Sequence, residues 1–395
     1  MRLNPRSLQM SALLTALVAI APISTDMYLP ALPAIGEAFG ASTAAVQLTL
    51  SFYLVGFAGA QLILGPLSDR YGRRPVLIGG ASVFVFASAA CYFAADINSL
   101  IAARFFQAVG ACAGGAVGRA AVRDIYETKD AARLLAHMGT AMAVAPLVAP
   151  LLGGQLTHYF GWETNFAALG LFGAIVLALS VTVLPETNTR PDPLALSPRR
   201  MIENYLSLAR HPDFRAYTLT NAFSFGGLFA FISGASFVLI GTFGLTPQTF
   251  GFAFAAPVIG YMIGTQVGAR MAKSHSVDEV VKFGSFLGVI AGLIGLVLTA
   301  VQPALWTVII PMFGFSASVG IVMPNSMAGS IGPFPHMAGA ASALMGFTQM
   351  GMAAGMGALV GLVHDGTALP TMAVIALSGA LSYIYSRQIR LVAED

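Results

Sequence analysis

Apolar residues occur along this chain in about twelve long stretches, which are separated by short polar breaks or by breaks rich in glycine and proline. Each stretch is close to the ~20 residues that a helix needs to cross a lipid bilayer. The pattern therefore predicts twelve membrane-spanning helices. Their approximate ranges are 8–35, 43–68, 74–95, 99–122, 133–159, 164–184, 213–242, 247–272, 278–300, 304–328, 338–363 and 367–386.

Positive charge is distributed unevenly between the two sides of this arrangement. With the N-terminus inside, all but one of the 20 Lys and Arg residues fall on the inner side. They are Arg2, Arg6, Arg70, Arg73, Arg74, Arg119, Arg123, Lys129, Arg133, Arg190, Arg199, Arg200, Arg210, Arg215, Arg270, Lys273, Lys282, Arg387 and Arg390. The charged residues of the outer loops are Glu37, Asp96, Glu163 and Asp365. Because cytoplasmic loops are enriched in Lys and Arg, the pattern predicts that both termini are cytoplasmic.

The composition excludes several classes of protein. Charged residues make up 9% of the 395 residues and apolar residues 56%, whereas soluble domains average ~25% charged residues. The net charge is +3, and the basic residues lie along the inner membrane face, where anionic lipid headgroups attract them. We therefore expect no nucleic-acid partner. Cys91 and Cys112 provide neither a disulfide framework nor metal-ligand spacing. The chain has no phosphate-binding P-loop and no hydrolase or protease motif, so we expect neither ATP-driven pumping, nor catalytic or metal-ligating residues, nor a cofactor.

The longest polar segment divides the chain into two halves of six spans each. This layout predicts a helical bundle over 1–184, a cytoplasmic linker over 185–212 and a second bundle over 213–395, with a binding cavity between the bundles. The second half of the linker is basic and amphipathic, which favours a helix on the inner membrane surface. In the second bundle, the phenylalanine-rich segment 222–237 is expected to face lipid, whereas the glycine-rich segment 346–361 is expected to be a helix-packing face.

One loop carries a specific motif. The sequence GPLSDRYGRRPVL over 65–77 combines a turn glycine, Gly72, with a carboxylate and three guanidinium groups at a helix end. It resembles motif A of the major facilitator superfamily at every characteristic position. The motif residues are Gly65, Asp69, Arg70, Gly72, Arg73 and Arg74. The resemblance implies that they form a conformational switch, whereas the segment 268–284 is a poor second copy without the matching aspartate.

Further segments narrow the resemblance. They are STDMYLPALPAI (24–35), RFFQAVGA (104–111), RDIY (123–126), APLVAPLLGG (145–154) and FPHMAGAAS (334–342). Together they resemble the bicyclomycin/chloramphenicol-resistance subfamily of drug:proton antiporters. The resemblance implies roles for Arg123 and Asp124 at the inner end of helix 4. It also implies an antiporter motif in helix 5 at Pro146, Pro150, Gly153 and Gly154, although Ala149 stands where the motif usually has glycine.

Two full charges lie well within the predicted spans. Asp26 is about nine residues from the outer end of helix 1, roughly 14 Å, and Arg104 is about five residues from the outer end of helix 4, roughly 8 Å. An ionisable group in this position costs roughly 2.5–3.5 kcal/mol, so it needs a partner, water or a function. We expect the two charges to share one hydrated cavity and to be energetically coupled; the alternative is a structural salt bridge. In the resembling antiporters the corresponding acid binds protons and substrate, and the arginine acts in proton coupling.

Weaker candidates are polar or aromatic residues within the spans, each of which is also suited to a packing role. They are Tyr28, Gln47, Tyr53, Gln61, Gln107, Asn221, Phe225, Asn325, Phe347 and Gln349. Their mixture suits a pocket for amphipathic molecules.

The sequence thus predicts a monomeric transporter in the bacterial inner membrane, surrounded by lipid, that exchanges protons for small-molecule drugs. Export of an amino acid, a sugar or another metabolite is the alternative that the resemblance leaves open.

Overall fold

The structure is a computed structural model that describes residues 7–189 and 191–389. These residues form helices and no strands, and 12 helical segments are long and apolar enough to cross a membrane. This confirms the predicted all-α multi-pass membrane protein, because each predicted stretch corresponds to one of the 12 segments. Arg2, Arg6, Arg190 and Arg390, which the charge pattern includes, and the side chain of Lys129 lie outside the described residues.

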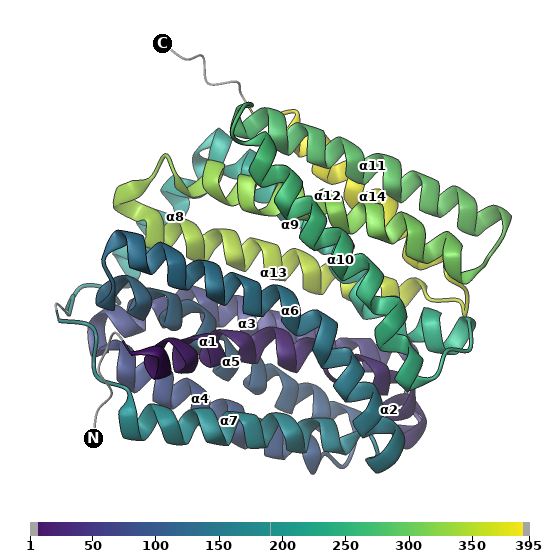
Figure 1. The fold of residues 1–395 in the computed structure, drawn as a ribbon, viewed down its shortest axis with the longest axis horizontal. Coiled ribbons are helices and arrows are strands. Elements are labelled where there is room, and N and C mark those ends of the chain that lie inside the picture. The colour runs from purple at the N-terminus through teal and green to yellow at the C-terminus, as the bar shows by residue number, and fades with distance from the viewer. Residues whose placement is uncertain (1–6, 190, 390–395) are drawn as a thin grey trace.

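The first six spans form one group of packed helices, the N-terminal bundle (Figure 1). The helices are α1 (Leu8–Asp26), the short 3₁₀ helix η1 (Leu29–Ala31), α2 (Leu32–Phe39), α3 (Thr43–Tyr71), α4 (Arg73–Tyr92), α5 (Ile97–Ile125), α6 (Thr128–Phe160) and α7 (Glu163–Val183).

The last six spans form the second group, the C-terminal bundle, which lies beside the first in Figure 1. Its helices are α9 (Pro212–Ser236), the π-helical turn η2 (Phe237–Thr242), α10 (Pro247–Met271), α11 (Val277–Val301), α12 (Leu305–Ile331), the 3₁₀ helix η3 (Pro335–Met337), α13 (Ala338–Val363) and α14 (Leu369–Ser386). Helix α8 (Pro198–Arg210) precedes them in the linker. It lies near the end of the molecule where α1 begins and α14 ends, which we call the basic end (Figure 1).

The first predicted span, 8–35, is interrupted in the structure. Helix α1 ends at Asp26, and the chain continues through a turn and η1 into α2. Pro33 has no N–H for the carbonyl of Leu29 four residues earlier. That carbonyl instead accepts hydrogen bonds from the N–H of Leu32 and from the hydroxyl of Ser236 in α9. The break in the first span is therefore stabilised in part by the C-terminal bundle.

The expectation that the phenylalanine-rich segment faces lipid is wrong. In α9, Phe229 and Phe231 are each only 1% exposed, and the helix packs against α12, α13 and α14. Lipid tails and a bundle interior are both apolar, so hydrophobicity alone does not distinguish a central helix from a peripheral one.

Two helix pairs join the bundles: α3 packs against α13, and α6 packs against α10. Along α13, a Cβ added at Gly346 or Gly361 would lie within 2.6 Å of the side chain of Gln61 or Gln47 in α3. Gly351 and Gly355 have no such neighbour within 4 Å. The predicted packing face of this helix is thus confirmed at its two ends, where it meets the other bundle.

Candidate functional site

Arg104 lies in α5 and is fully buried inside the N-terminal bundle. Its Nη1 group donates to the backbone carbonyl of Ser24 in α1 at 3.2 Å and to the side-chain oxygen of Gln107 one turn along α5. Gln107 in turn donates to the hydroxyl of Ser88 in α4 at 2.8 Å. These bonds connect α1, α4 and α5 through one side-chain network.

Aromatic rings provide the rest of the surroundings of this guanidinium. Its carbon lies 4.2 Å from the ring centroid of Tyr28 and 4.2 Å from that of Tyr53, and 5.8 Å from that of Phe166. A desolvated cation over an aromatic face gains roughly 2 kcal/mol or more, which offsets part of the cost of burying the charge. Nε and Nη2 have no hydrogen-bond acceptor among the described residues. The guanidinium is therefore enclosed by aromatic rings and, among the described residues, hydrogen-bonded through Nη1 alone.

Asp26 is the last residue of α1 and is 5% exposed. Among the described residues its carboxyl group has neither a hydrogen bond nor an ion pair, and no oxygen of it lies within 4.0 Å of a nitrogen of Arg104. The structure thus does not form the direct salt bridge that the sequence allows between these charges. The reason is local: Arg104 is turned toward the carbonyl of Ser24, two residues before Asp26, and toward the rings that enclose it.

Helix α6 approaches this break closely through its paired glycines. A Cβ at Gly153 would lie 1.6 Å from the carbonyl oxygen of Met27, the residue after Asp26. A Cβ at Gly154 would lie 2.1 Å from the carbonyl oxygen of Pro247, where α10 of the other bundle begins. Pro146 and Pro150 both lie within the same helix. The predicted helix 5 motif therefore lies between the broken first span and the C-terminal bundle.

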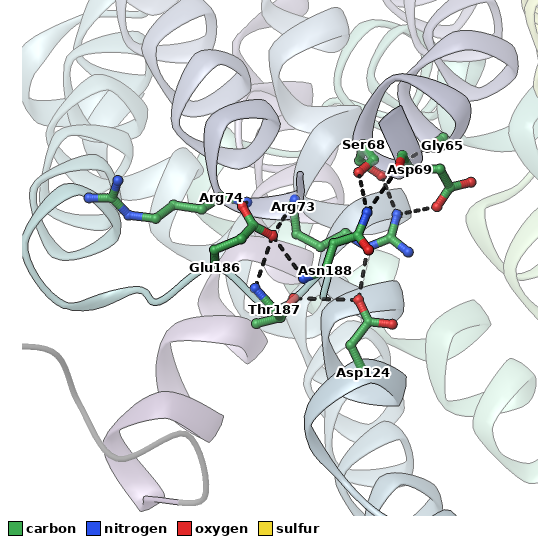
Figure 2. Close-up of polar contacts among 9 residues, drawn as sticks. All are labelled: Gly65, Ser68, Asp69, Arg73, Arg74, Asp124, Glu186, Thr187 and Asn188. Atoms are coloured by element: carbon green, nitrogen blue, oxygen red, sulfur yellow. Dashed lines mark hydrogen bonds and ion pairs between the residues drawn. The ribbon is translucent and has the colours of Figure 1, made fainter. Parts of the chain in front are cut away.

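The motif A residues form a network at the basic end of α3, α4 and α5 (Figure 2). Arg73 pairs with Asp69 of α3 and, through Nε, with Asp124 of α5 at 2.9 Å. Its Nη1 group also donates to the hydroxyl of Ser68 at 2.6 Å. This guanidinium thus holds together the ends of three helices.

Glu186, in the linker three residues after the end of α7, is a member of this network that the sequence analysis missed (Figure 2). Its carboxylate accepts four backbone N–H groups, those of Arg73, Arg74, Thr187 and Asn188, at 2.8–3.1 Å. Two of these donors open helix α4, where the helix dipole favours an anion. An acid immediately after an apolar span, next to the linker prolines, is the signal that identifies it in the sequence.

Gly72 provides the turn that makes this contact possible. Its φ is +102°, and an added Cβ would lie 2.4 Å from a carboxylate oxygen of Glu186. Residues other than glycine rarely adopt such a backbone conformation. Arg74 donates to the carbonyl oxygens of Leu184 and Val181 at 2.8 and 2.7 Å, so that α4 is also fixed to the end of α7.

The remaining motif residues have smaller parts in the network. The carbonyl of Gly65 accepts a hydrogen bond from the Ser68 hydroxyl at 2.8 Å. Arg70 lies over the ring of Tyr71 at 5.3 Å from its centroid. Arg123 is exposed in the last turn of α5.

The weaker candidates do not all surround one pocket. Tyr28, Tyr53 and Gln107 contact Arg104 within the N-terminal bundle, and Gln47 and Gln61 lie where α3 meets α13.

In the C-terminal bundle, Asn221 donates to Gln349 at 3.1 Å and Asn325 donates to the carbonyl of Ile321 at 2.7 Å. Phe225 packs near Phe229, whereas Phe347 is 40% exposed. The structure therefore groups three of the ten around Arg104. Of the others, two lie at the seam where α3 meets α13, and five lie in the C-terminal bundle.

In the part of the chain that the structure describes, twelve apolar helical segments lie in two groups, with a span broken at a buried acid and a charge network at one end. The family model of the Major Facilitator Superfamily matches residues 14–358. The chain belongs to this superfamily and is therefore a secondary transporter rather than an enzyme.

Similar proteins agree with this assignment. An uncharacterized MFS-type transporter of Bacillus subtilis, YdgK, is 32% identical over 95% of this chain and 94% of its own. A chloramphenicol resistance protein of Pseudomonas aeruginosa is 33% identical over 84% of this chain and 78% of its own. The crystal structure of a D-xylose–proton symporter superposes with a TM-score of 0.74 at 14% identity, covering 96% of this chain and 97% of its own, which shows the shared fold.

Proposed function

We propose that this protein is a proton-coupled antiporter that exports small, partly hydrophobic compounds, including antibiotics, across the bacterial cytoplasmic membrane. The names of its relatives support drug export: besides the chloramphenicol resistance protein, a bicyclomycin resistance protein homolog of Haemophilus influenzae is 28% identical over 92% of both chains. In this proposal it works as a monomer without a cofactor, with the basic end in the cytoplasm.

The observation that carries the coupling proposal is the isolation of Asp26. A carboxyl group that is 5% exposed, at the end of a broken membrane helix and without a hydrogen bond or ion pair among the described residues, has no evident structural role. Ionisable groups in such positions are costly and mark proton or ion pathways in transporters. Asp26 is thus the candidate group that exchanges a proton with one side and binds substrate from the other.

Arg104 supplies the charge to which this acid responds. Its cationic guanidinium lies between the rings of Tyr28 and Tyr53, and two of its nitrogens, Nε and Nη2, have no acceptor among the described residues. In the proposed cycle, an ionised Asp26 is drawn toward Arg104 or toward a cationic substrate, and a protonated Asp26 is released from both. In this cycle Asp26 moves at the break after α1, where the first span is not a continuous helix.

The motif A network provides the conformational part of the cycle. It lies at the basic end and joins α3, α4, α5 and the linker, all within or next to the N-terminal bundle. We propose that this network keeps the N-terminal bundle rigid while the two bundles rock against each other. Transport then follows from a shift of the equilibrium between the inward-facing and outward-facing states.

Substrate-dependent proton release tests the proposal. The purified protein is reconstituted in liposomes with an internal pH dye, and a panel of antibiotics, amino acids and sugars is added. Antibiotics are expected to induce proton movement that an inactive variant lacks. Proton movement induced by metabolites alone would favour the alternative of metabolite export. Drug transport against the drug's own gradient that persists without any proton gradient would refute proton coupling.

A further inference from the structure

Helix α8 of the linker is attached to both bundles by one of its faces. Leu208 is fully buried in a cluster with Phe214 of α9 and with Ala341 and Met345 of α13. On the same side of α8, the hydroxyl of Tyr205 donates to the backbone carbonyl of Leu62 in α3 at 3.1 Å. The helix therefore crosses the α3–α13 seam.

The sequence of α3 explains why this carbonyl is available. Pro66 lies within α3, four residues after Leu62, and has no N–H to offer. Within a membrane-spanning helix, an unsatisfied carbonyl costs several kcal/mol, so a partner from outside the helix is favoured. Burial raises the pKa of the Tyr205 hydroxyl, which keeps it a neutral donor.

This hydrogen bond also fixes the depth of α8 relative to the bilayer. Leu62 lies nine residues before the end of α3 at Tyr71, about 14 Å along the helix axis. The 29 residues of α3 extend about 43 Å, whereas the hydrocarbon core is about 30 Å thick, so a centred helix projects about 7 Å on each side. The Leu62 carbonyl then lies about 7 Å inside the hydrocarbon boundary by the same dimensions. Because Tyr205 reaches it from α8, the helix backbone lies near the level of the lipid headgroups.

The opposite face of α8 is both apolar and basic. Ile202 and Leu206, one turn apart, are 57% and 48% exposed, and Arg199 and Arg210 follow on the adjacent arc of the same side. Arg199 pairs with exposed Glu203 at 2.8 Å, whereas Arg210 has no ion pair among the described residues. An apolar arc next to basic side chains at headgroup depth is typical of a helix that binds an anionic membrane surface.

We propose that α8 is a binding site for anionic phospholipids of the leaflet at the basic end. Ile202 and Leu206 enter the boundary between headgroups and acyl chains, and Arg210, with Arg199, contacts the lipid phosphates. Because the buried face of α8 is attached at the seam between the bundles, lipid bound on its outer face is coupled to the segment that connects them. The argument rests on the fold and the contacts of α8, and it does not require that the substrate be a drug.

Lipid retention by the purified full chain tests the charge part of the proposal. The protein in nanodiscs of mixed phosphatidylcholine and phosphatidylglycerol is released into native mass spectrometry, and the bound lipids are counted. The wild type is expected to retain phosphatidylglycerol preferentially. The double variant Arg199→Gln/Arg210→Gln is expected to show about a fivefold smaller preference from the loss of Arg210, the unpaired arginine, alone. Arg270→Gln/Lys273→Gln is the matched control, because it removes two exposed charges of the basic end that lie outside α8.

The depth of the helix is measured independently of charge. A fluorophore on Ala209→Cys, which is exposed on the apolar side, is expected to be quenched by lipids that carry a nitroxide near the headgroup end of the acyl chain. The same label on Lys273→Cys is expected to be quenched less. Equal loss of phosphatidylglycerol in the control pair, no lipid preference in the wild type, or no quenching at Ala209→Cys would each overturn the proposal.

Discussion

Gly154→Ala is the substitution whose effect the structure defines most clearly. The added Cβ would lie 2.1 Å from the carbonyl oxygen of Pro247, whereas ordinary contact begins near 3.4 Å. One backbone must therefore move by about 1.3 Å, the difference between these two distances. Such overpacking costs roughly 1–3 kcal/mol.

The consequence follows from where the two residues lie. Gly154 belongs to α6 of the N-terminal bundle and Pro247 to α10 of the C-terminal bundle, so the strain is relieved when the bundles separate at this end. A strain of 1–3 kcal/mol shifts the equilibrium toward such a state by about 5- to 150-fold. Electron–electron distance measurements between spin labels on Tyr159→Cys and Phe252→Cys, two exposed positions of α6 and α10, are expected to show a larger population at long distance.

Gly139→Ala is the matched control. Gly139 lies in the same helix, and nothing lies within 4 Å of an added Cβ. Both substitutions raise helix propensity by about 1 kcal/mol, so this contribution cancels in the comparison. An unchanged distance distribution in Gly154→Ala, or the same shift in both variants, would refute the idea that the glycine holds the two bundles together.

Three further substitutions test the charge networks. Arg73→Ala is expected to slow the transport cycle while equilibrium binding of substrate is unchanged, since Arg73 acts at the ends of α3 and α5; stopped-flow transport and a binding isotherm distinguish the two. Glu186→Ala is expected to lower the free energy of unfolding by about 1–3 kcal/mol, seen as a lower melting temperature, because four N–H donors lose their shared acceptor. The control Glu203→Ala, on the exposed face of α8, is expected to have little effect. Arg104→Lys keeps the charge but loses the planar contact with the tyrosine rings, so coupled transport is expected to fail; full activity in proteoliposomes would contradict this role.

The sequence predicts the membrane spans well because each span is an apolar stretch of sufficient length between polar breaks. It predicts less well what happens within a span. The interruption of the first span at Asp26 depends on proline positions together with Ser236, which is remote in sequence. The placement of the phenylalanines of α9 depends on which helices surround it, and composition carries no information on this.

The surroundings of the two buried charges show the same limit. The rings around Arg104 come from the break after α1, from α3 and from α7, so only the assembled bundle brings them together. Intramembrane charge identifies Asp26 and Arg104 as exceptional residues, but it does not reveal that Arg104 has aromatic partners and no direct bond to Asp26. The contact of Glu186 with motif A is likewise a product of the linker path after α7.

The central claim is that Asp26 couples proton entry to export, and one substitution tests it most directly. Asp26→Asn removes the charge and preserves the shape of the side chain. The variant is compared in proteoliposomes with Glu37→Gln, which removes an exposed acid from α2, the helix that follows the break after α1. Asp26→Asn is expected to exchange substrate down its gradient but not to concentrate it against a gradient when a pH difference is imposed, whereas Glu37→Gln does both. Uphill export by Asp26→Asn at the wild-type level would contradict the assignment of this residue as the coupling acid.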